Sequence, residues 1–154
     1  MEERLVKVGI THGDINGIGY EVILKTLSDT RITELCTPVI YGSSKIAAYH
    51  RKALELPAVN LSIIAQAEDA GVNRVNVINC VDDETKVELC QSTTVAGEAA
   101  YLALEAAVTD LKRGAVDVLV TAPINKHNIQ NEQFHFPGHT EYLEQCFGGL
   151  GKKA

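Results

Sequence analysis

The sequence has little that would direct this chain to nucleic acid or to a membrane. No run of Lys or Arg exceeds two residues, and 20 acidic residues against 14 basic ones give a formal net charge of -6. We therefore expect no nucleic acid and no membrane among its partners. No apolar run approaches the length that crosses a bilayer. Residues 1–7 are charged where a secretory signal would have its apolar segment, so we expect a cytoplasmic protein.

Cysteine and histidine show no pattern typical of a metal centre or a disulfide framework. The cysteines form no C-x-x-C pair, and in a chain without an export signal we interpret them as free, buried thiols. His12, His127 and His135 are scattered along the sequence, so we predict no metal site built from this chain alone. The cysteines are Cys36, Cys80, Cys90 and Cys146.

What is present is an alternation of strand-like and helix-like segments. With 154 residues, 45% of them hydrophobic, the chain can bury one core of ordinary size. The alternation predicts an α/β fold with a mainly parallel sheet and helices on both faces. The expected strands are residues 4–11, 37–42, 60–66, 75–79 and 118–122, and the expected helices are 20–28, 43–56 and 93–113.

Local signals fix several of these boundaries. Ser43 or Ser44 can cap the second helix, and Pro57 ends it. Thr93 or Thr94 opens the third helix, and Gly114 can take the left-handed conformation that closes it. The third helix is apolar on nearly all sides, so we expect it to be buried on more than one side.

The most informative stretch runs from residue 118 to residue 146. An apolar strand ends at Pro123, and Asn125, Lys126, His139 and Thr140 follow within a short span. Ligands of open α/β sheets bind beyond the carboxyl ends of the strands, so these groups suit a small anionic or polyol-like substrate. The alternative is a solvated loop followed by an ordinary helix start.

Individual residues of that stretch also have two interpretations. His139 and Thr140 lie where a helix begins, and its free N–H groups favour an anion; alternatively Thr140 is an N-cap and His139 a turn residue. Lys126 could screen a phosphate or be one more surface lysine. His50 belongs to an amphipathic helix, and we expect it to be exposed.

A glycine-rich loop follows the first strand. Gly13 to Gly19 read G-x-x-x-G-x-G, which is not the G-x-G-x-x-G dinucleotide fingerprint, and no Walker lysine follows. The glycines could let the backbone approach a ligand, or could only let the strand and helix pack closely. Asp14 and Glu21 could be capping carboxylates that complement the helix dipole.

Three motifs stand out together: I-T-H-G-D-I-N-G-I-G-Y-E at residues 10–21, T-A-P-I-N-K at 121–126 and F-P-G-H-T-E-Y at 136–142. In this order they resemble the 4-hydroxythreonine-4-phosphate dehydrogenase family. The first also resembles the G-D-x-x-G-I-G-x-E loop of the isocitrate and isopropylmalate dehydrogenases, whose fold the family shares. His12, Ile15, Asn16 and Tyr20 depart from the family's usual I-T-P-G-D-P-A-G-I-G-P-E, but the glycines are intact and the turn should survive.

The resemblance implies a reaction. A dehydrogenase of this family oxidises 4-phosphohydroxy-L-threonine with NAD or NADP to the 3-ketone, which decarboxylates to 3-amino-2-oxopropyl phosphate for vitamin B6 and pyridoxal phosphate synthesis. A divalent metal, which is zinc, magnesium or cobalt, polarises the reacting oxygen. The substrate-binding residues carried over are His139 and Thr140, and the possible cleft residues are Gly13, Asp14, Asn125 and Lys126. The resemblance also implies a homodimer.

The resemblance further implies that this chain is the amino-terminal portion of a longer protein. Residues 1–123 would form a first α/β domain that the family's carboxyl-terminal tail completes, and residues 124–154 would begin a second, substrate and metal domain. Metal ligands would lie after Ala154. We therefore expect the piece alone to be inactive and, because it exposes sheet and helix faces, to self-associate or to be marginally stable.

Two alternatives stay open. A sister dehydrogenase of 4-phospho-threonate or 4-phospho-erythronate would share all three motifs. If the chain truly ends at residue 154, it could instead be a non-catalytic phosphate-binding α/β module.

Overall fold

The structure is a computed structural model that describes residues 4–131 and 134–148. Within these residues no helix combines the length and the apolar character needed to cross a membrane. Along the chain the elements are β1 (Val6–Thr11), α1 (Gly19–Leu27), α2 (Ile32–Leu35), β2 (Cys36–Gly42), α3 (Ser44–Ala53), β3 (Leu61–Ile63), the 3-10 turn η1 (Ala67–Asp69), β4 (Val75–Asn79), α4 (Thr94–Lys112), β5 (Val118–Thr121) and α5 (His139–Phe147).

The described strands form one sheet in the order β3-β4-β2-β1-β5, and every pair of neighbours is parallel. The predicted α/β class is therefore confirmed. The chain proceeds from β1 to β2 on one side and places β5 on the other side of β1. Strand order thus reverses at β1, and the carboxyl ends of β1 and β5 flank that switch point.

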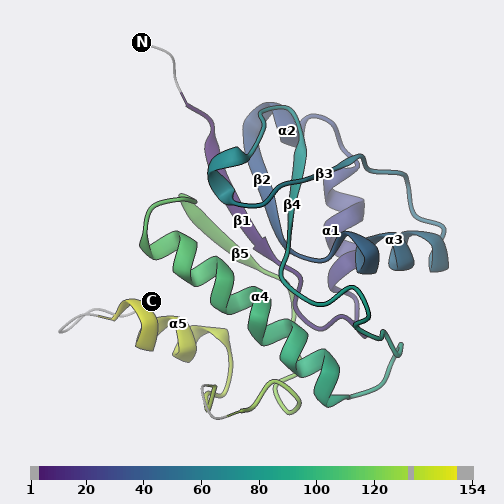
Figure 1. Cartoon of the computed structure of the whole chain (residues 1–154), viewed down its shortest axis with the longest axis vertical. Helices are drawn as coiled ribbons and strands as arrows, with labels where there is room; N and C mark the ends of the chain where they lie inside the picture. Colours follow the sequence, from purple (N-terminus) through teal and green to yellow (C-terminus); the bar gives the residue numbers. More distant parts are fainter. Residues whose placement is uncertain (1–3, 132–133, 149–154) are drawn as a thin grey trace.

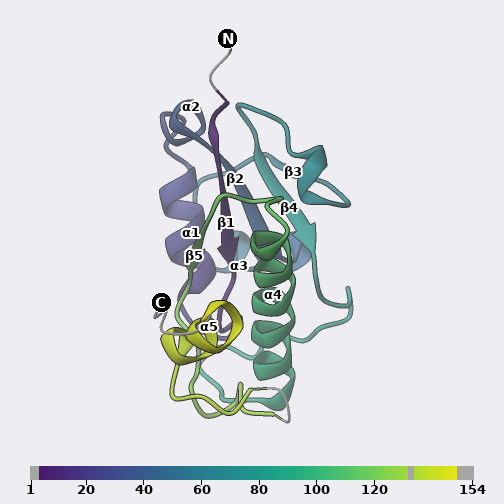
Figure 2. The same cartoon turned by 90° about the vertical axis from the view of Figure 1, so that its left-hand side faces the viewer.

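Helices cover both faces of the sheet, as predicted. On one face, Ile23 and Leu27 of α1 pack with Ile40 of β2. On the other face, Ala103 and Ala107 of α4 pack with strand residues of β2. Figure 1 shows α4 running across the sheet, and Figure 2 shows α1 and α4 on opposite sides of it.

The longest helix is also buried on a second side, as its all-round apolar sequence predicts. Ala100, Leu104 and Val108 of α4 pack with Phe134 and Tyr142. These aromatic residues come from the segment that leads into and forms α5, which lies beside α4 in both views (Figures 1 and 2). Helix α4 therefore joins the sheet to the last part of the chain.

The predicted caps form. Ser43 is the N-cap of α3, and its side chain accepts a hydrogen bond from the Ile46 N–H at 3.2 Å. Thr93 caps α4 by accepting from the Ala96 N–H at 3.1 Å. Gly114 follows α4 with φ of 78°. Of the two candidates at each helix start, the first residue is therefore the cap.

Two elements are shorter than the sequence predicts. Helix α3 ends at Ala53 and not near Pro57, because Glu55 takes a left-handed φ of 52° and the Leu56 N–H bonds back to the Arg51 carbonyl. That bond closes the helix as a Schellman motif and buries Leu56 in the core. Strand β3 covers only Leu61–Ile63, because the chain then turns into η1.

Strand β5 is an edge of the sheet within the described residues, and it exposes apolar side chains. Val118 is 44% exposed and Val120 is 52% exposed, on the face that they share with Val8 and Ile10 of β1. Edge strands with exposed apolar residues promote association between chains. The expectation of exposed sheet faces is thus met at β5, and self-association remains a prediction.

Val120→Lys is expected to weaken self-association of the chain about tenfold, because a charge on the exposed face of an edge strand opposes pairing. Sedimentation across a concentration series measures it. The control is Val72→Lys, since Val72 is 61% exposed and belongs to no strand. Equal effects of the two variants would show that β5 is not the surface of association.

Candidate functional site

The three motifs meet at the carboxyl end of the sheet. The Gly13–Gly19 loop follows β1, and residues 122–126 follow β5, its parallel neighbour. Both segments therefore leave the sheet at the switch point described above. Open α/β folds bind ligands at such a crevice because two loops diverge there and leave space between them.

Backbone hydrogen bonds join the loop after β5 to the end of β1 and to the loop that follows β1. The Ala122 N–H bonds to the Thr11 carbonyl at 3.1 Å, and the Asp14 N–H bonds to the Pro123 carbonyl at 2.8 Å. Gly13 makes this approach possible, since its φ is 66° and a Cβ there would lie 2.8 Å from the Ala122 carbonyl oxygen and closer still to that of Pro123. The loop after β1 is thus a support for the loop after β5.

Hydrogen bonds within the Gly13–Gly19 loop use donors that a phosphate would need. The Asn16 N–H bonds to Asp14 Oδ1 at 3.0 Å, and the Gly17 N–H bonds to the Asp14 carbonyl at 3.0 Å. The Asp14 N–H is also engaged, as just described. Of the two interpretations of the glycines, the geometry favours close packing, and the loop does not fit a dinucleotide cradle.

Asn125 shapes the turn that carries Lys126. Its Oδ1 accepts from the His127 N–H at 2.9 Å and from the Asn128 N–H at 3.1 Å. The Gln130 side chain then donates to the carbonyls of Lys126, at 2.9 Å, and Phe136, at 2.8 Å. These bonds tie the T-A-P-I-N-K motif to the segment before α5.

Lys126 and His139 are brought together at the start of α5. The Lys126 side chain lies over Gly138, its Nζ 3.8 Å from the point where a Cβ on that glycine would be. Burial, and then the charge of Lys126, lower the pKa of His139. Its Nε2 is buried and has no hydrogen-bond partner among the described residues. The site thus pairs an exposed cation with a neutral, unpartnered imidazole.

Thr140 is not the N-cap of α5. The helix runs His139–Phe147, and its N-cap is Gly138, which makes no side-chain cap hydrogen bond. Thr140 is exposed in the first turn. One alternative interpretation of this threonine is therefore wrong. The helix dipole and the Lys126 ammonium favour an anion at the amino end of α5. The Glu141 carboxylate is also there, with its Oε2 3.6 Å from the point where a Cβ on Gly138 would be, and it opposes a second negative charge.

An aromatic cluster holds α5 in place. Phe134 is fully buried, and its ring centroid lies 4.9 Å from that of Tyr142 in α5. Tyr101 of α4 meets both rings edge-on, with centroids at 6.5 and 6.4 Å. The position of His139 therefore depends on the packing of α5 against α4.

The described residues do not fit a metal centre. Across residues 4–131 and 134–148 no three His, Cys, Asp or Glu side chains lie close enough to hold an ion. The four cysteines are free thiols, as predicted, but the prediction that they are buried is wrong: Cys90 is exposed, and the other three are partly exposed.

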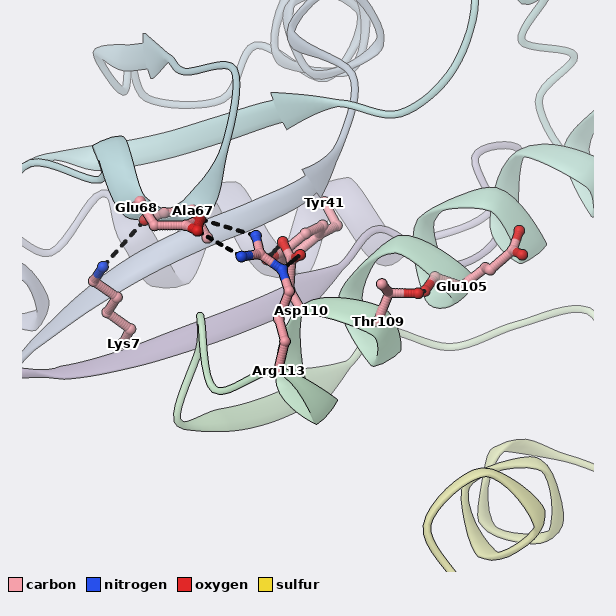
Figure 3. A network of polar contacts seen from close by, with 8 residues as sticks. All are labelled: Lys7, Tyr41, Ala67, Glu68, Glu105, Thr109, Asp110 and Arg113. Carbon is pink, nitrogen blue, oxygen red and sulfur yellow. Dashed lines mark hydrogen bonds and ion pairs between the residues drawn. The ribbon is translucent and has the colours of Figure 1, made fainter.

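A second polar cluster has a structural role (Figure 3). Arg113, after α4, donates to Glu68 at 2.9 Å and to Asp110 at 2.9 Å, and the Tyr41 hydroxyl donates to Asp110 at 2.6 Å. The hydrogen bonds from Arg113 lower the pKa of Glu68 to about 2. Since the three charged groups satisfy one another, the cluster binds α4 to η1 and β2 and contains no residue of the three motifs.

Sequence reasoning was wrong about His50 and did not identify the contacts of His12 and Tyr20. His50, expected to be exposed, is fully buried in α3, because it shares a helix face with Ile46 and Ala47. His12 and Tyr20 are also fully buried and hydrogen-bond to each other at 2.8 Å. The spacing from Ile46 to His50 is the signal that could have placed His50 inside.

Comparison with known proteins gives a consistent result. A family model described as "Pyridoxal phosphate biosynthetic protein PdxA" matches residues 34–152. The chain is 59% identical over 152 residues to a 4-hydroxythreonine-4-phosphate dehydrogenase of Bacteroides thetaiotaomicron. It is 32% identical over 143 residues to a protein of Clostridium botulinum named provisionally as a D-threonate 4-phosphate dehydrogenase.

A solved structure agrees with these relatives. The crystal structure of a 4-hydroxythreonine-4-phosphate dehydrogenase from Burkholderia phymatum has 29% sequence identity and a TM-score of 0.82, covering 95% of this chain and 44% of that one. The two curated relatives are matched over 99% and 88% of this chain but over only 42% and 41% of their own lengths. The chain therefore spans about two fifths of the proteins that it resembles.

Proposed function

Because the chain belongs to the family described as pyridoxal phosphate biosynthetic protein PdxA, we propose that it is part of a dehydrogenase acting on 4-phosphohydroxy-L-threonine. The complete protein would oxidise the secondary alcohol to the 3-ketone with NAD or NADP, and the β-keto acid would decarboxylate to 3-amino-2-oxopropyl phosphate. A divalent cation would supply the Lewis acid. No cluster of three His, Cys, Asp or Glu side chains occurs among the described residues, so the cation would be held by other parts of the protein.

The observation that supports this proposal is the pairing of Lys126 with His139 at the switch point of the sheet. The amino end of α5 has no side-chain cap, and the Lys126 ammonium lies beside it. Both features favour an anionic group of the substrate, either its phosphate or its carboxylate. Binding and orienting that group is the part of the reaction that we assign to this chain.

His139 is suited to contact an uncharged polar group of the substrate. Burial and the nearby Lys126 hold its pKa below the ordinary value, so the ring is neutral at pH 7. A neutral imidazole has one donor and one acceptor, and the buried Nε2 has no partner among the described residues. A hydrogen bond between a substrate hydroxyl and this neutral ring would fix the orientation of the alcohol.

In the complete protein, Lys126→Ala is expected to raise the KM for 4-phosphohydroxy-L-threonine about tenfold, because it removes a charge-assisted contact. His139→Ala is expected to lower turnover about tenfold, because the alcohol loses its orientation. Reduction of NAD+ or NADP+ followed by absorbance measures both. Absence of any turnover by the unmodified complete protein would overturn the proposed function.

Matched controls separate these effects from general changes of charge or fold. His135→Ala removes an exposed imidazole four residues before His139, and Lys45→Ala removes an exposed ammonium at the start of α3. Neither should change KM or turnover. If His139→Ala behaved like His135→Ala, then His139 would be a turn residue only.

A second candidate is a dehydrogenase of 4-phospho-threonate or 4-phospho-erythronate. The provisional name of the Clostridium botulinum relative favours it. The two substrates differ from 4-phosphohydroxy-L-threonine in having a hydroxyl where that substrate has an amine, and they share the phosphate that Lys126 would meet. A panel of the three substrates, assayed at equal concentration with the complete protein, distinguishes the candidates. A non-catalytic phosphate-binding module would bind inorganic phosphate and turn over none of them.

A further inference from the structure

The loop between β1 and α1 is held by buried polar side chains that none of the roles above uses. His12, at the start of the loop, and Tyr20, in the first turn of α1, are both 0% exposed. The His12 Nδ1 lies 2.8 Å from the Tyr20 hydroxyl oxygen, and the His12 Nε2 lies 2.8 Å from the Ala99 carbonyl oxygen of α4. One histidine thus connects the loop to two helices on opposite faces of the sheet.

The partners determine where the protons are. A carbonyl oxygen only accepts, so Nε2 of His12 carries the proton and donates to Ala99. Nδ1 of the neutral ring is then an acceptor, and the Tyr20 hydroxyl donates to it. The Tyr20 oxygen in turn accepts from the Ser43 N–H at 2.8 Å. Every polar side-chain atom of the His12–Tyr20 pair therefore has a hydrogen-bond partner. Through Ser43, these hydrogen bonds also reach the junction of β2 and α3.

A second histidine extends this arrangement to the middle of the loop. The His50 ring stacks on Tyr20, with centroids 5.4 Å apart and planes at 22°. The His50 Nε2 donates to the Ile15 carbonyl at 2.7 Å. There is no free space around the pair, since a Cβ at Gly42 would lie 2.7 Å from the His12 Nδ1. The loop is therefore held at its start, at its centre and at its end.

The position of this loop determines that of the loop after β5. The Asp14 N–H, two residues after His12, bonds to the Pro123 carbonyl, three residues before Lys126. In the part of the chain that the structure describes, no other backbone hydrogen bond links the Gly13–Gly19 loop to residues 122–126. A shift of the first loop would therefore be transmitted to the turn that carries Lys126.

We propose that His12 and Tyr20 are positioning residues that, through the Asp14–Pro123 hydrogen bond, hold the Lys126 turn in place for the anionic group of the substrate. The effect on substrate rests on the function proposed above. The effect on the loop does not, because it is a property of the chain itself.

The test removes one oxygen atom. Tyr20→Phe keeps the ring that stacks on His50 but leaves the Ser43 N–H and the His12 Nδ1 without their partner. In the 154-residue chain, amide exchange at Asp14 and Gly17 is expected to accelerate about tenfold, with exchange in β4 unchanged. In the complete protein, the KM for 4-phosphohydroxy-L-threonine is expected to rise about tenfold, with kcat changed less than about twofold.

The control is Tyr49→Phe. Tyr49 lies in the same helix as His50 and meets its ring edge-on at 5.7 Å, but it is 46% exposed and its hydroxyl makes no hydrogen bond that the structure describes. This variant should leave both amide exchange and KM unchanged. His12→Gln gives a second route to the same result, and its effect combined with Tyr20→Phe should be less than the sum of the two.

The outcomes separate the two proposals. The inference is overturned if the amides of Asp14 and Gly17 exchange at the same rate in the Tyr20→Phe and Tyr49→Phe variants. It is also overturned if Tyr20→Phe accelerates amide exchange throughout the sheet, because the His12–Tyr20 pair would then be an ordinary part of the core. If the unmodified complete protein has no turnover but the loop amides respond as expected, then the proposed function fails and the positioning of the loop stands.

Discussion

Gly13→Ala is expected to lower the free energy of unfolding of the chain by about 3 kcal/mol or more. Two costs combine at this position. A residue with a Cβ is strained at a φ of 66°. The new methyl group would also overlap the backbone carbonyls of Ala122 and Pro123, which cannot rotate away as a side chain would. Urea denaturation of the two chains measures the difference.

Gly114→Ala is the matched control for this substitution. Gly114 also has a positive φ, of 78°, but a Cβ there would meet no atom within 4 Å. Gly114→Ala should therefore lower the free energy of unfolding by the backbone strain alone, about 1 to 2 kcal/mol. The additional loss of unfolding free energy in Gly13→Ala, relative to Gly114→Ala, measures the contact between the two loops. Equal costs at the two positions would show that the loops are not held against each other.

The chain is expected to lose about 3 kcal/mol of stability between pH 7 and pH 4 because of His12 alone. Burial lowers the pKa of His12 to about 4, from an ordinary value of 6.5. Between these values the unfolded chain binds a proton that the folded chain does not. Stability due to His12 is therefore fully present above pH 6.5, falls as the pH falls, and stops falling below about pH 4. His50, whose pKa burial also lowers, adds to the same trend.

Urea denaturation at a series of pH values tests this dependence. The His12→Gln variant should be less stable than the original chain at pH 7 but should show a shallower slope below pH 6.5, since it lacks the titrating ring. His127→Gln, which removes an exposed imidazole, is the control and should keep the original slope. Parallel curves for His12→Gln and the original chain would show that His12 does not titrate as a buried group.

The parts of the fold that depend on local sequence could be predicted. The alternation of strands and helices, the caps at Ser43 and Thr93 and the glycine after α4 each follow from residues close together in the chain. The end of α3 was missed because Glu55, a residue with no preference for the left-handed region, adopts it there. Local sequence rules predict a right-handed conformation for Glu55, and the burial of Leu56 outweighs that preference.

The candidate site could be predicted only in part. The motifs place Asn125, Lys126 and His139 near one another, since they are close in sequence. The partnership of Asp14 with Pro123 could not be deduced, because it needs β5 to pair with β1 and the sequence does not specify strand order. The burial of His12 could not be deduced either, because its hydrogen-bond partners, Tyr20 and Ala99, come from two different helices that are far apart in the sequence.

The place of β5 in the sheet also determines when the site can form during folding. Lys7, in β1, bonds through its N–H to Asp117, 110 residues later. The pairing of β1 with β5 must therefore close a very long loop, which costs entropy before any contact repays it. The strands β2, β3 and β4 and the helix α4 all lie between the two partners. The two loops of the site would thus meet late, when β5, the last described strand, docks against β1. A chain emerging from the ribosome would therefore have a nearly complete sheet before it had a binding site.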